Sequence, residues 1–555
     1  MRSLISLLIC CLTVSPAAKA QFTHADSLRG FLSSERACYD VLYYNLDLRL
    51  DTVSRSIAGS NGITFSAVND FDVMQIDLFE NYHVDSIILD GKKHASFERD
   101  GKAMFVRLSE KIRKGSKHTV TVFYAGTPQV AKRPPWDGGF TWERDRHGEL
   151  WIGVSCQGLG ASSWWPNKDH QSDEPDSMLM SITVPSNLID VSNGRLRDVQ
   201  DYGNGWTRYA WFISYPINNY NVTLNIAKYS YFNDEYVNAT GDTLTLDYYV
   251  LPYNLEKAKA QFSQVPSMMK IFEKRFGKYP FYRDGYKLVE TPYLGVEHQS
   301  AVAYGNDYLQ GYRGTSAADI GLTFDFIIIH ESAHEWWGNS VTSNDIADSW
   351  IHEGFGAYAE AVYVEDLYGY RKAMEYVNGK KPGVVNDRPI IGTYGVDNNG
   401  SKDMYIKGQL ILNTLRHVID NDKLWWEIVK GIAETFAYKN IDSDDIFAYI
   451  NRKTGKDYGY FFNQYFKTTV VPTLNVFIRK KGPAVRMSYK WEEKGFRMPI
   501  KVTGGRGEYS FIYPTDSVQT TRFDYLNPEE FRVAEDQFYV NVKVSTMYVD
   551  PAKVE

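Results

Sequence analysis

The sequence predicts a multidomain α+β protein, with an N-terminal antiparallel β domain, a mostly helical middle domain and a small C-terminal β-sandwich. The chain has 555 residues, whereas a single hydrophobic core rarely grows beyond about 250–300 residues. Strand-like alternation extends to about residue 250, helical spacing follows, and short alternating runs return after Pro472. We therefore place the three domains at residues 21–250, 251–471 and 472–555, after a signal peptide at residues 1–20.

The N-terminal domain is predicted from strands whose apolar residues alternate with polar ones. In Leu42–Leu50 every even position is Leu or Tyr and most odd positions are polar, which is the pattern of a half-buried strand. Similar segments are Met74–Leu78, His118–Tyr124, Met178–Val184, Asn221–Ala227 and Leu244–Val250. Turn residues such as Asn193-Gly194 separate them, so we expect one large antiparallel β domain.

The middle domain is predicted from segments with helical spacing and few β-branched residues. These segments are Leu255–Phe276, Gly321–Asn339, Asp348–Leu367, Asp403–Asp420, Leu424–Phe436 and Ser443–Thr454. Beyond Pro472 the alternating runs are Leu474–Ile478, Val485–Tyr489, Pro499–Val502 and Tyr539–Val544. They predict a C-terminal β-sandwich of roughly 80 residues.

The composition is that of a globular protein. Apolar residues make up 43% and charged residues 23% of the chain, which excludes a disordered, collagen-like or polytopic membrane protein. The formal net charge of -7 argues against a dedicated nucleic-acid binder. Aromatic residues reach 15%, with 40 Tyr and 13 Trp, which suits large β-rich cores and surfaces that bind peptides or sugars.

The N-terminus has the pattern of a secretory signal. A basic start at Arg2 precedes the apolar segment Leu4–Val14 and the small-residue site Ala18-Lys19-Ala20. The apolar segment is too short for a stable membrane anchor. We expect cleavage before Gln21 and an exported protein, periplasmic or secreted, of bacterial origin.

Cleavage at this site would leave two of the four cysteines. Cys38 and Cys156 remain, far apart in the sequence. An oxidising compartment would allow them to pair, and two buried free thiols are the other possibility. No other segment approaches the length of a membrane-spanning helix, so we expect no stable membrane insertion.

The strongest chemical signal is His330-Glu331-Ser332-Ala333-His334. Residues i and i+4 share one face of a helix, so both imidazoles can reach one metal ion, while Glu331 is placed to approach a water on that ion. An amphipathic helix with two solvent-facing histidines would be the simpler interpretation. Four apolar residues, Phe326–Ile329, precede His330 and favour burial instead, and buried imidazoles need partners.

Zinc with two histidine ligands needs a third protein ligand and an open position. Glu353 follows His334 after eighteen residues, on a predicted second helix that can return to the first. This combination of His330, Glu331, His334 and Glu353 resembles the gluzincin aminopeptidases of family M1, which include aminopeptidase N and leukotriene A4 hydrolase. The resemblance implies a thermolysin-like middle domain and one zinc ion per chain, held by His330, His334 and Glu353.

A second segment supports an aminopeptidase over other gluzincins. Leu294-Gly295-Val296-Glu297 resembles the Gly-x-Met-Glu-Asn segment of the family, although Val296 replaces Met and His298 replaces Asn. The resemblance implies that Gly295 and Glu297 belong to the substrate site and that Glu297 binds the free α-ammonium. A carboxylate near the metal can pair with that cation and measure one residue from the chain end.

Two further segments carry site residues by resemblance. Tyr405-Ile406-Lys407-Gly408 matches the Tyr-x-Lys-Gly segment, whose tyrosine donates a hydrogen bond to the oxyanion. Gln157 lies in a segment similar to the Gln-rich strand of the first specificity pocket, and it would orient the N-terminal residue of the substrate. We also expect aromatic residues around the N-terminus of the peptide, namely Trp164, Trp165, Tyr293 and Tyr405.

The predicted function is therefore zinc-dependent hydrolysis of the N-terminal peptide bond, with Glu331 as general base and Tyr405 as oxyanion donor. The alternatives are a thermolysin-like endopeptidase, a non-catalytic peptide-binding protein and an epoxide-hydrolase side activity. Large M1 members add a long helical domain, whereas residues 472–555 read as strands, so we expect a short form without it. We expect peptide substrates and a monomer, with a dimer left open.

Overall fold

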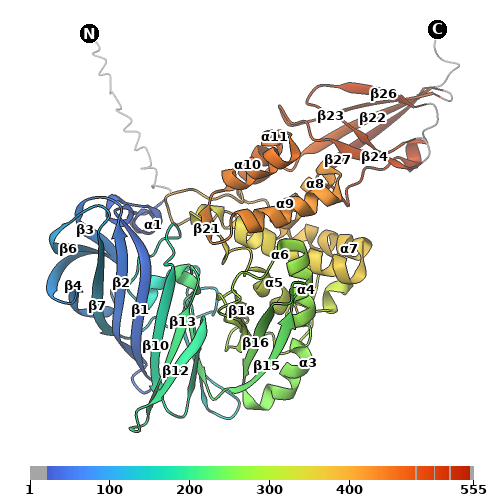
Figure 1. Ribbon diagram of the computed structural model, residues 1–555. Coiled ribbons are helices and arrows are strands. Elements are labelled where there is room, and N and C mark those ends of the chain that lie inside the picture. Colours follow the sequence, from blue (N-terminus) through green and yellow to red (C-terminus); the bar gives the residue numbers. More distant parts are fainter. Residues whose placement is uncertain (1–21, 482–483, 505–506, 524–526, 550–555) are drawn as a thin grey trace, which may run out of the picture.

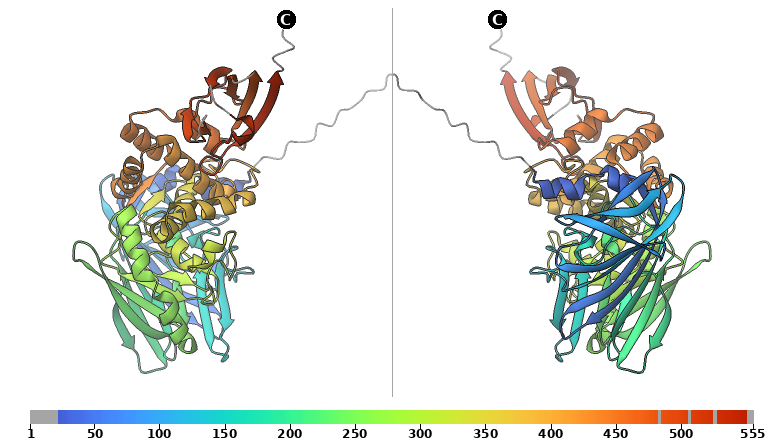
Figure 2. Two further views of the ribbon diagram at one scale, coloured as in Figure 1. Left: turned by 90° about the vertical axis from the view of Figure 1, so that its right-hand side faces the viewer. Right: turned by 90° about the vertical axis from the view of Figure 1, so that its left-hand side faces the viewer.

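The fold is described from a computed structural model, which places residues 22–481, 484–504, 507–523 and 527–549 (Figure 1). The predicted signal peptide lies outside these described residues. A large β-sheet domain lies beside a domain of helices and a smaller sheet, and the C-terminal strands extend from the helices. This confirms the predicted N-terminal β domain and helical middle region. Figure 2 shows the same arrangement from the two sides.

A ten-stranded sheet forms most of the N-terminal domain, in the order β12-β13-β10-β1-β2-β7-β4-β5-β6-β3. Its strands are β1 (Tyr39–Asp51), β2 (Ser56–Ala67), β3 (Phe71–Asp77), β4 (Tyr82–Leu89), β5 (Lys93–Asp100), β6 (Ala103–Ile112), β7 (Lys117–Gly126), β10 (Ser177–Pro185), β12 (Arg195–Asp201) and β13 (Trp206–Ile213). Two short helices, α1 (His24–Gly30) and α2 (Ser34–Ala37), precede β1.

The predicted antiparallel pairing is wrong at one position, because β1 runs parallel to β10 while it runs antiparallel to β2. The predicted alternation in β1 holds from Tyr44 to Leu50, where the even positions are buried. Before Tyr44 a bulge between Val41 and Tyr43 shifts the phase, so Tyr39 and Val41 are buried and Leu42 is only half-buried. An extra residue in one strand reverses the face that each later side chain takes.

A second sheet of the same domain carries the segment that approaches the candidate site. Its order is β11-β14-β9-β8, with β8 (Gly139–Arg144), β9 (Leu150–Ser155), β11 (Ile189–Ser192) and β14 (Leu224–Ala227). Gln157 is the second residue after the end of β9. Both sheets share one hydrophobic core, which includes the free, buried thiols of Cys38 and Cys156, so these cysteines do not form a disulfide.

A five-stranded sheet crosses the domain boundary predicted at residue 250. Its order is β15-β16-β17-β19-β18, with β15 (Ser230–Val237), β16 (Thr243–Val250), β17 (Tyr286–Glu290), β18 (Gly295–Val296) and β19 (Val302–Tyr304). β16 pairs with β17 in parallel, and side chains of β15 and β16 belong to the core of the helical domain. The middle domain therefore contains a sheet, whose edge strand β18 begins at Gly295.

Most of the other elements of the middle domain are helices. They are α3 (Leu255–Phe262), α4 (Val265–Phe276), α5 (Phe326–Ala333), α6 (Trp350–Tyr368), α7 (Tyr370–Lys380), α8 (Ile406–Ile419), α9 (Asp422–Thr435), α10 (Ser443–Thr454) and α11 (Gly459–Lys467), with the short pair β20 (Val341–Ser343) and β21 (Lys439–Ile441). In the part of the chain that the structure describes, no helix has the length and apolar character needed to cross a membrane.

Two predicted helices are shorter in the structure. The single helix predicted over Leu255–Phe276 is divided into α3 and α4, because Pro266 stands in the first turn of α4 and cannot donate a backbone hydrogen bond. The helix predicted over Gly321–Asn339 begins only at Phe326, where the Asp325 carboxylate caps it by accepting from the backbone N–H of Ile327 at 3.0 Å.

The chain after Pro472 forms strands, as predicted. A mixed sheet has the order β26-β23-β22-β27, with β22 (Thr473–Lys481), β23 (Ala484–Trp491), β26 (Gln519–Phe523) and β27 (Asn541–Val549), and β24 (Ile500–Thr503) pairs with β25 (Tyr509–Ile512). Buried side chains of these strands continue the core of the helical domain without a break. A β-sandwich in the strict sense stays a prediction.

Candidate metal centre and substrate site

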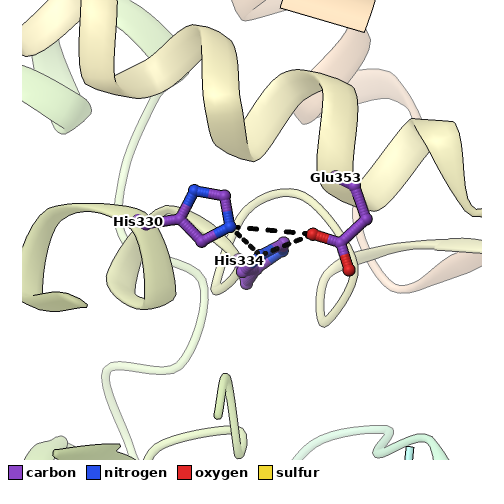
Figure 3. A group of neighbouring side chains, drawn as sticks. All are labelled: His330, His334 and Glu353. Atoms are coloured by element: carbon purple, nitrogen blue, oxygen red, sulfur yellow. Dashed lines mark hydrogen bonds and ion pairs between the residues drawn. The ribbon is translucent and has the colours of Figure 1, made fainter. Parts of the chain in front are cut away.

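The two histidines of the motif lie on consecutive turns at the end of α5. His330 is inside the helix, and His334 is the residue that follows its last turn. Their Nε2 atoms face each other at 3.3 Å, and both side chains are buried (Figure 3). The spacing of four residues therefore brings both imidazoles to one point, as the sequence predicted.

Glu353 completes the group from the first turn of α6. Its Oε2 lies 3.4 Å from His334 Nε2 and 3.7 Å from His330 Nε2 (Figure 3). One ligand atom from each of the three residues lies within 4.8 Å of the others, and all three residues are buried. The structure thus brings together the three residues that the sequence assigned to the metal.

The second nitrogen of each imidazole is engaged away from this point. His330 Nδ1 lies 2.7 Å from Glu360 Oε1, and His334 Nδ1 lies 2.8 Å from the carbonyl oxygen of Trp337. These acceptors place the ring proton on Nδ1 and leave the Nε2 lone pair free for a metal ion. Two imidazole nitrogens and one carboxylate form the donor set of a catalytic zinc site, so the residues present fit this ion.

Glu360 is a functional residue that the sequence reasoning missed. It lies seven residues after Glu353 on α6, which is two helical turns and hence the same face. Its other oxygen, Oε2, accepts a hydrogen bond of 2.6 Å from the Tyr376 hydroxyl and forms an ion pair with Lys380. The spacing of seven residues after the ligand Glu353 could have identified Glu360 in the sequence. Metal-bound histidines commonly hydrogen-bond a carboxylate, and a glutamate at this spacing lies on the same helix face.

α6 comes close to the imidazoles because it carries glycine beside Glu353. A Cβ at Gly356 would lie 2.9 Å from Cε1 of His334, closer than real contacts permit, and 3.2 Å from its Nε2. Glycine is therefore required here so that the helix backbone can approach the imidazoles. The local sequence Glu353-Gly354-Phe355-Gly356 builds both the ligand and the room beside it.

Glu331 lies in the same turn as the ligands and is 8% exposed. Burial raises the pKa of its carboxyl to about 7, and the nearby carboxylate of Glu297 acts in the same direction. A pKa near neutrality suits a group that accepts and returns a proton. Gly295 lies against it: a Cβ on Gly295 would be 3.3 Å from Glu331 Cγ and 2.6 Å from a methyl carbon of Ile327.

Glu297 is buried directly after β18, and its carboxylate meets the predicted Gln157. Gln157 Nε2 donates to Glu297 Oε1 at 2.5 Å and lies 3.4 Å from Glu353 Oε1. The hydroxyl of Tyr220 donates to Glu297 Oε1 at 3.1 Å. Tyr220, in the turn Asn219–Asn221, was missed by the sequence reasoning, and no motif in its segment points to it. These contacts join the β domain to the ligand set.

Tyr405 lies beside His330. Its ring is 5.9 Å from the His330 ring, centre to centre, at an interplanar angle of 26°. Burial and the carboxylate of Glu353 raise the pKa of the Tyr405 phenol well above its ordinary value. The hydroxyl therefore keeps its proton at neutral pH and can act as a donor.

Two of the aromatic residues predicted around the N-terminus of a peptide have other positions. Trp164 and Trp165 have no exposed surface and belong to the core of the β domain, so their predicted place is wrong. Tyr293 is also buried, and its hydroxyl donates to the carbonyl oxygen of Val154 at 3.0 Å. Paired tryptophans bury more apolar area inside a sheet domain than they would on its surface.

Residues 260–465, which contain both histidines, Glu353 and Tyr405, match the model of the peptidase family M1 domain. This part of the chain is similar to an M1 peptidase domain. It contains the motif His330–His334 and Glu353, the third predicted metal ligand.

Curated relatives are consistent with an M1 domain. Mouse endoplasmic reticulum aminopeptidase 1 is 23% identical over 351 residues, which are 60% of this chain and 36% of that protein. Leukotriene A-4 hydrolase of Xenopus laevis is 22% identical over 447 residues, 75% of this chain and 68% of that protein. The chain thus spans about a third of the length of the mouse aminopeptidase.

A solved structure has the same fold around the M1 domain. The M1 zinc metallopeptidase of Deinococcus radiodurans, bound to a Tyr-Ser-Ala substrate, matches with a TM-score of 0.67 and 19% identity. The match covers 80% of this chain and 98% of that one. The similarity therefore includes the N-terminal sheet domain as well as the helices that carry the candidate site.

Proposed function

We propose that this protein is a zinc-dependent aminopeptidase that removes single residues from peptides with a free α-amine. The observation that carries this proposal is the position of the Gln157 side chain. Its Nε2 donates a hydrogen bond to Glu297 at 2.5 Å and lies 3.4 Å from Glu353. One amide thus spans the distance between a buried carboxylate and the metal ligands. A substrate whose ammonium pairs with Glu297 would have its first carbonyl beside the metal.

Zinc held by His330, His334 and Glu353 would act as a Lewis acid on the scissile carbonyl and make a bound water more acidic. Glu331, in the same turn of α5, takes a proton from the attacking water and returns it to the leaving amine. Tyr405 donates its hydroxyl proton in a hydrogen bond to the carbonyl oxygen, where charge develops in the transition state.

Glu297 and Gln157 select the substrate in this scheme. The carboxylate is buried, so an uncharged or acetylated N-terminus would leave it away from solvent without a cation. An endopeptidase needs the opposite, because the chain must continue on both sides of the cleaved bond. The arrangement therefore supports an exopeptidase over a thermolysin-like endopeptidase.

A panel of aminoacyl-arylamides tests the proposed function. Free aminoacyl-arylamides should be hydrolysed, the same compounds with an acetylated amine should not, and a chelator should abolish the activity until zinc is returned. Equal rates on free and acetylated compounds would favour an endopeptidase. Stoichiometric zinc without any hydrolysis would favour a non-catalytic peptide-binding protein.

We also propose that residues 1–20 are a signal peptide and that the mature protein is exported. The basic start, the short apolar segment and the Ala18-Lys19-Ala20 site support this proposal. N-terminal sequencing of the protein recovered outside the cytoplasm should begin at Gln21. A mature protein that retains Met1 would contradict it.

A further inference from the structure

A short turn of the N-terminal β domain contacts the proposed ammonium site. It consists of Asn218 and the single helical turn Asn219–Asn221, between β13 and β14, and all four residues are buried. Asn218 caps the turn, because its side-chain oxygen accepts from the backbone N–H of Asn221 at 3.1 Å. Its amide nitrogen donates to the carbonyl oxygen of Gly338 in the middle domain at 3.1 Å. The turn is thereby fixed in shape and joined to the loop that follows the histidine motif.

Two other side chains of the turn hold Glu297 at two points. The Tyr220 hydroxyl donates to the carboxylate oxygen Oε1 of Glu297 at 3.1 Å. Asn221 Nδ2 donates to Asn339 Oδ1 at 2.5 Å, and Asn339 Nδ2 donates to the backbone carbonyl oxygen of Glu297 at 2.9 Å. The β domain therefore fixes both the side chain and the backbone of a residue that belongs to the middle domain.

His352 favours the direction of the hydrogen bond from Tyr220. The backbone N–H of Ser343 donates to His352 Nε2 at 2.9 Å, which places the ring proton on Nδ1. His352 Nδ1 lies 3.5 Å from the Tyr220 hydroxyl oxygen, so that oxygen faces an N–H donor. The hydroxyl proton of Tyr220 is thereby left for Glu297. All of these side chains are buried, where a hydrogen bond is stronger than it is in water.

Both side-chain donors to the Glu297 carboxylate meet the same oxygen. Gln157 Nε2 and the Tyr220 hydroxyl lie 2.5 and 3.1 Å from Oε1. Among the residues that the structure describes, no side chain donates to the second oxygen, Oε2. Rotation of the carboxylate would break both bonds to Oε1, so the two donors restrict its orientation. Oε2 is therefore the oxygen that can accept from a substrate cation.

We propose that Tyr220 and Asn221 are positioning residues for the free α-amine of the substrate, because they hold Glu297 so that its Oε2 receives the ammonium. This rests on the proposed aminopeptidase function and makes recognition of the amine depend on the β domain. The amide of Asn221 and the hydroxyl of Tyr220 donate to Asn339 and Glu297 rather than to the predicted metal ligands. Their loss should weaken binding of the amine and leave the metal centre intact.

The test uses two competitive inhibitors that differ only in the α-amine. One is the hydroxamate of the amino acid whose arylamide is hydrolysed fastest, and the other is the same compound without the amine. Both bind the metal through the hydroxamate, so the ratio of their inhibition constants reports the amine site. Tyr220→Phe should raise the inhibition constant of the amine compound about tenfold, because a hydrogen bond to a buried charge is lost, and change the other by less than about twofold. On arylamides the loss should appear in KM more than in kcat.

Tyr124→Phe is the matched control for Tyr220→Phe. Tyr124 is a buried tyrosine of the same domain, and its hydroxyl donates to the carbonyl oxygen of Trp164 at 3.0 Å. This control should leave the ratio of the inhibition constants unchanged. Thermal unfolding and zinc content of each variant report its folding and its metal centre.

Asn221→Ala is a second, independent variant, because it acts on Glu297 through Asn339. It should lower the preference for the amine compound in the same direction, so it still tests the proposal if Tyr220→Phe does not fold. Asn225→Ala is its control, since Asn225 is buried in the same domain and donates to the carbonyl oxygen of Val191 at 3.1 Å. The control should keep the ratio of the unaltered protein.

An equal change of both inhibition constants in Tyr220→Phe would indicate a purely structural role and overturn the proposal, as would no change in either. In both cases, hydrolysis of free but not acetylated aminoacyl-arylamides by the unaltered protein would still support the proposed function. Absence of hydrolysis of any aminoacyl-arylamide by the unaltered, zinc-loaded protein would instead reject the proposed function, and this proposal with it.

Discussion

At the scale of single residues, the site separates groups that would hold the metal from groups that would move protons. His330, His334 and Glu353 meet at one point, whereas Glu331 leaves the same turn of α5 toward the substrate side, beside Gly295. This division follows from the helical period, because i and i+4 coincide while i+1 is rotated by about 100°.

Glu331→Gln should separate the two roles. The variant keeps the shape of the side chain and all three ligands, so zinc content should stay at one per chain. Turnover of aminoacyl-arylamides should fall by about 10²-fold or more, because the amide cannot accept the proton. Metal analysis and initial rates on the same preparation check this. Rates like those of the unaltered protein would remove Glu331 from the mechanism.

Glu360→Gln should weaken the metal centre without touching a ligand. Glu360 accepts from His330 Nδ1 at 2.7 Å, and this contact orients the ring and makes it a better ligand. Loss of such a carboxylate lowers metal affinity by about 10–100-fold. Competition with a zinc chelator measures the affinity directly. Glu375→Gln on α7 is the matched control, because the Glu375 side chain is 45% exposed and pairs with Lys372, away from the metal ligands.

At the scale of elements, α6 is positioned by a carboxylate just before its start. Asp348 has no exposed surface, and its oxygens accept from the backbone N–H of Ser443 at 3.0 Å and from the Tyr394 hydroxyl at 2.9 Å. It therefore joins the start of α6 to the start of α10. Burial raises the pKa of Asp348 to about 6, above the unfolded value near 3.8.

This shift gives a pH dependence with a defined sign. A carboxyl whose pKa is raised in the folded state binds more protons there, so stability falls as the pH rises between about 4 and 6. The contribution is at most about 3 kcal/mol for a shift of this size. In Asp348→Asn this part of the pH dependence should disappear, as measured by urea unfolding at pH 4.5, 5.5 and 6.5. The exposed Asp85, changed to Asn, should leave the profile as it was. A profile in Asp348→Asn that parallels the unaltered protein would contradict the assignment.

The same scale shows why some elements could be predicted and others could not. The metal ligands depend on local spacing along two helices, which the sequence contains in full. β15 and β16 belong to the middle domain because β16 pairs in parallel with β17, and about 35 residues that include α3 and α4 separate these partners. A parallel pairing across helices leaves no short-range signal in either strand.

At the scale of the whole molecule, the proposed substrate site lies where the two domains meet. Gln157 and Tyr220 come from the β domain, while Glu297 and the ligands come from the middle domain. The sequence identified Gln157 through its motif but not Tyr220, whose position at Glu297 depends on how the domains pack. Trp164 and Trp165 were misplaced for the same reason: their motif is next to Gln157 in the sequence, but their side chains turn into the core.

Product analysis on an unmodified peptide tests the central claim most directly. The zinc-loaded protein is incubated with a peptide of about ten residues that has a free N-terminus, and the products are followed by mass spectrometry over time. The account predicts a ladder in which single residues are lost successively from the N-terminal end, and an acetylated copy of the peptide that stays intact. Internal fragments, or equal cleavage of the acetylated copy, would contradict it.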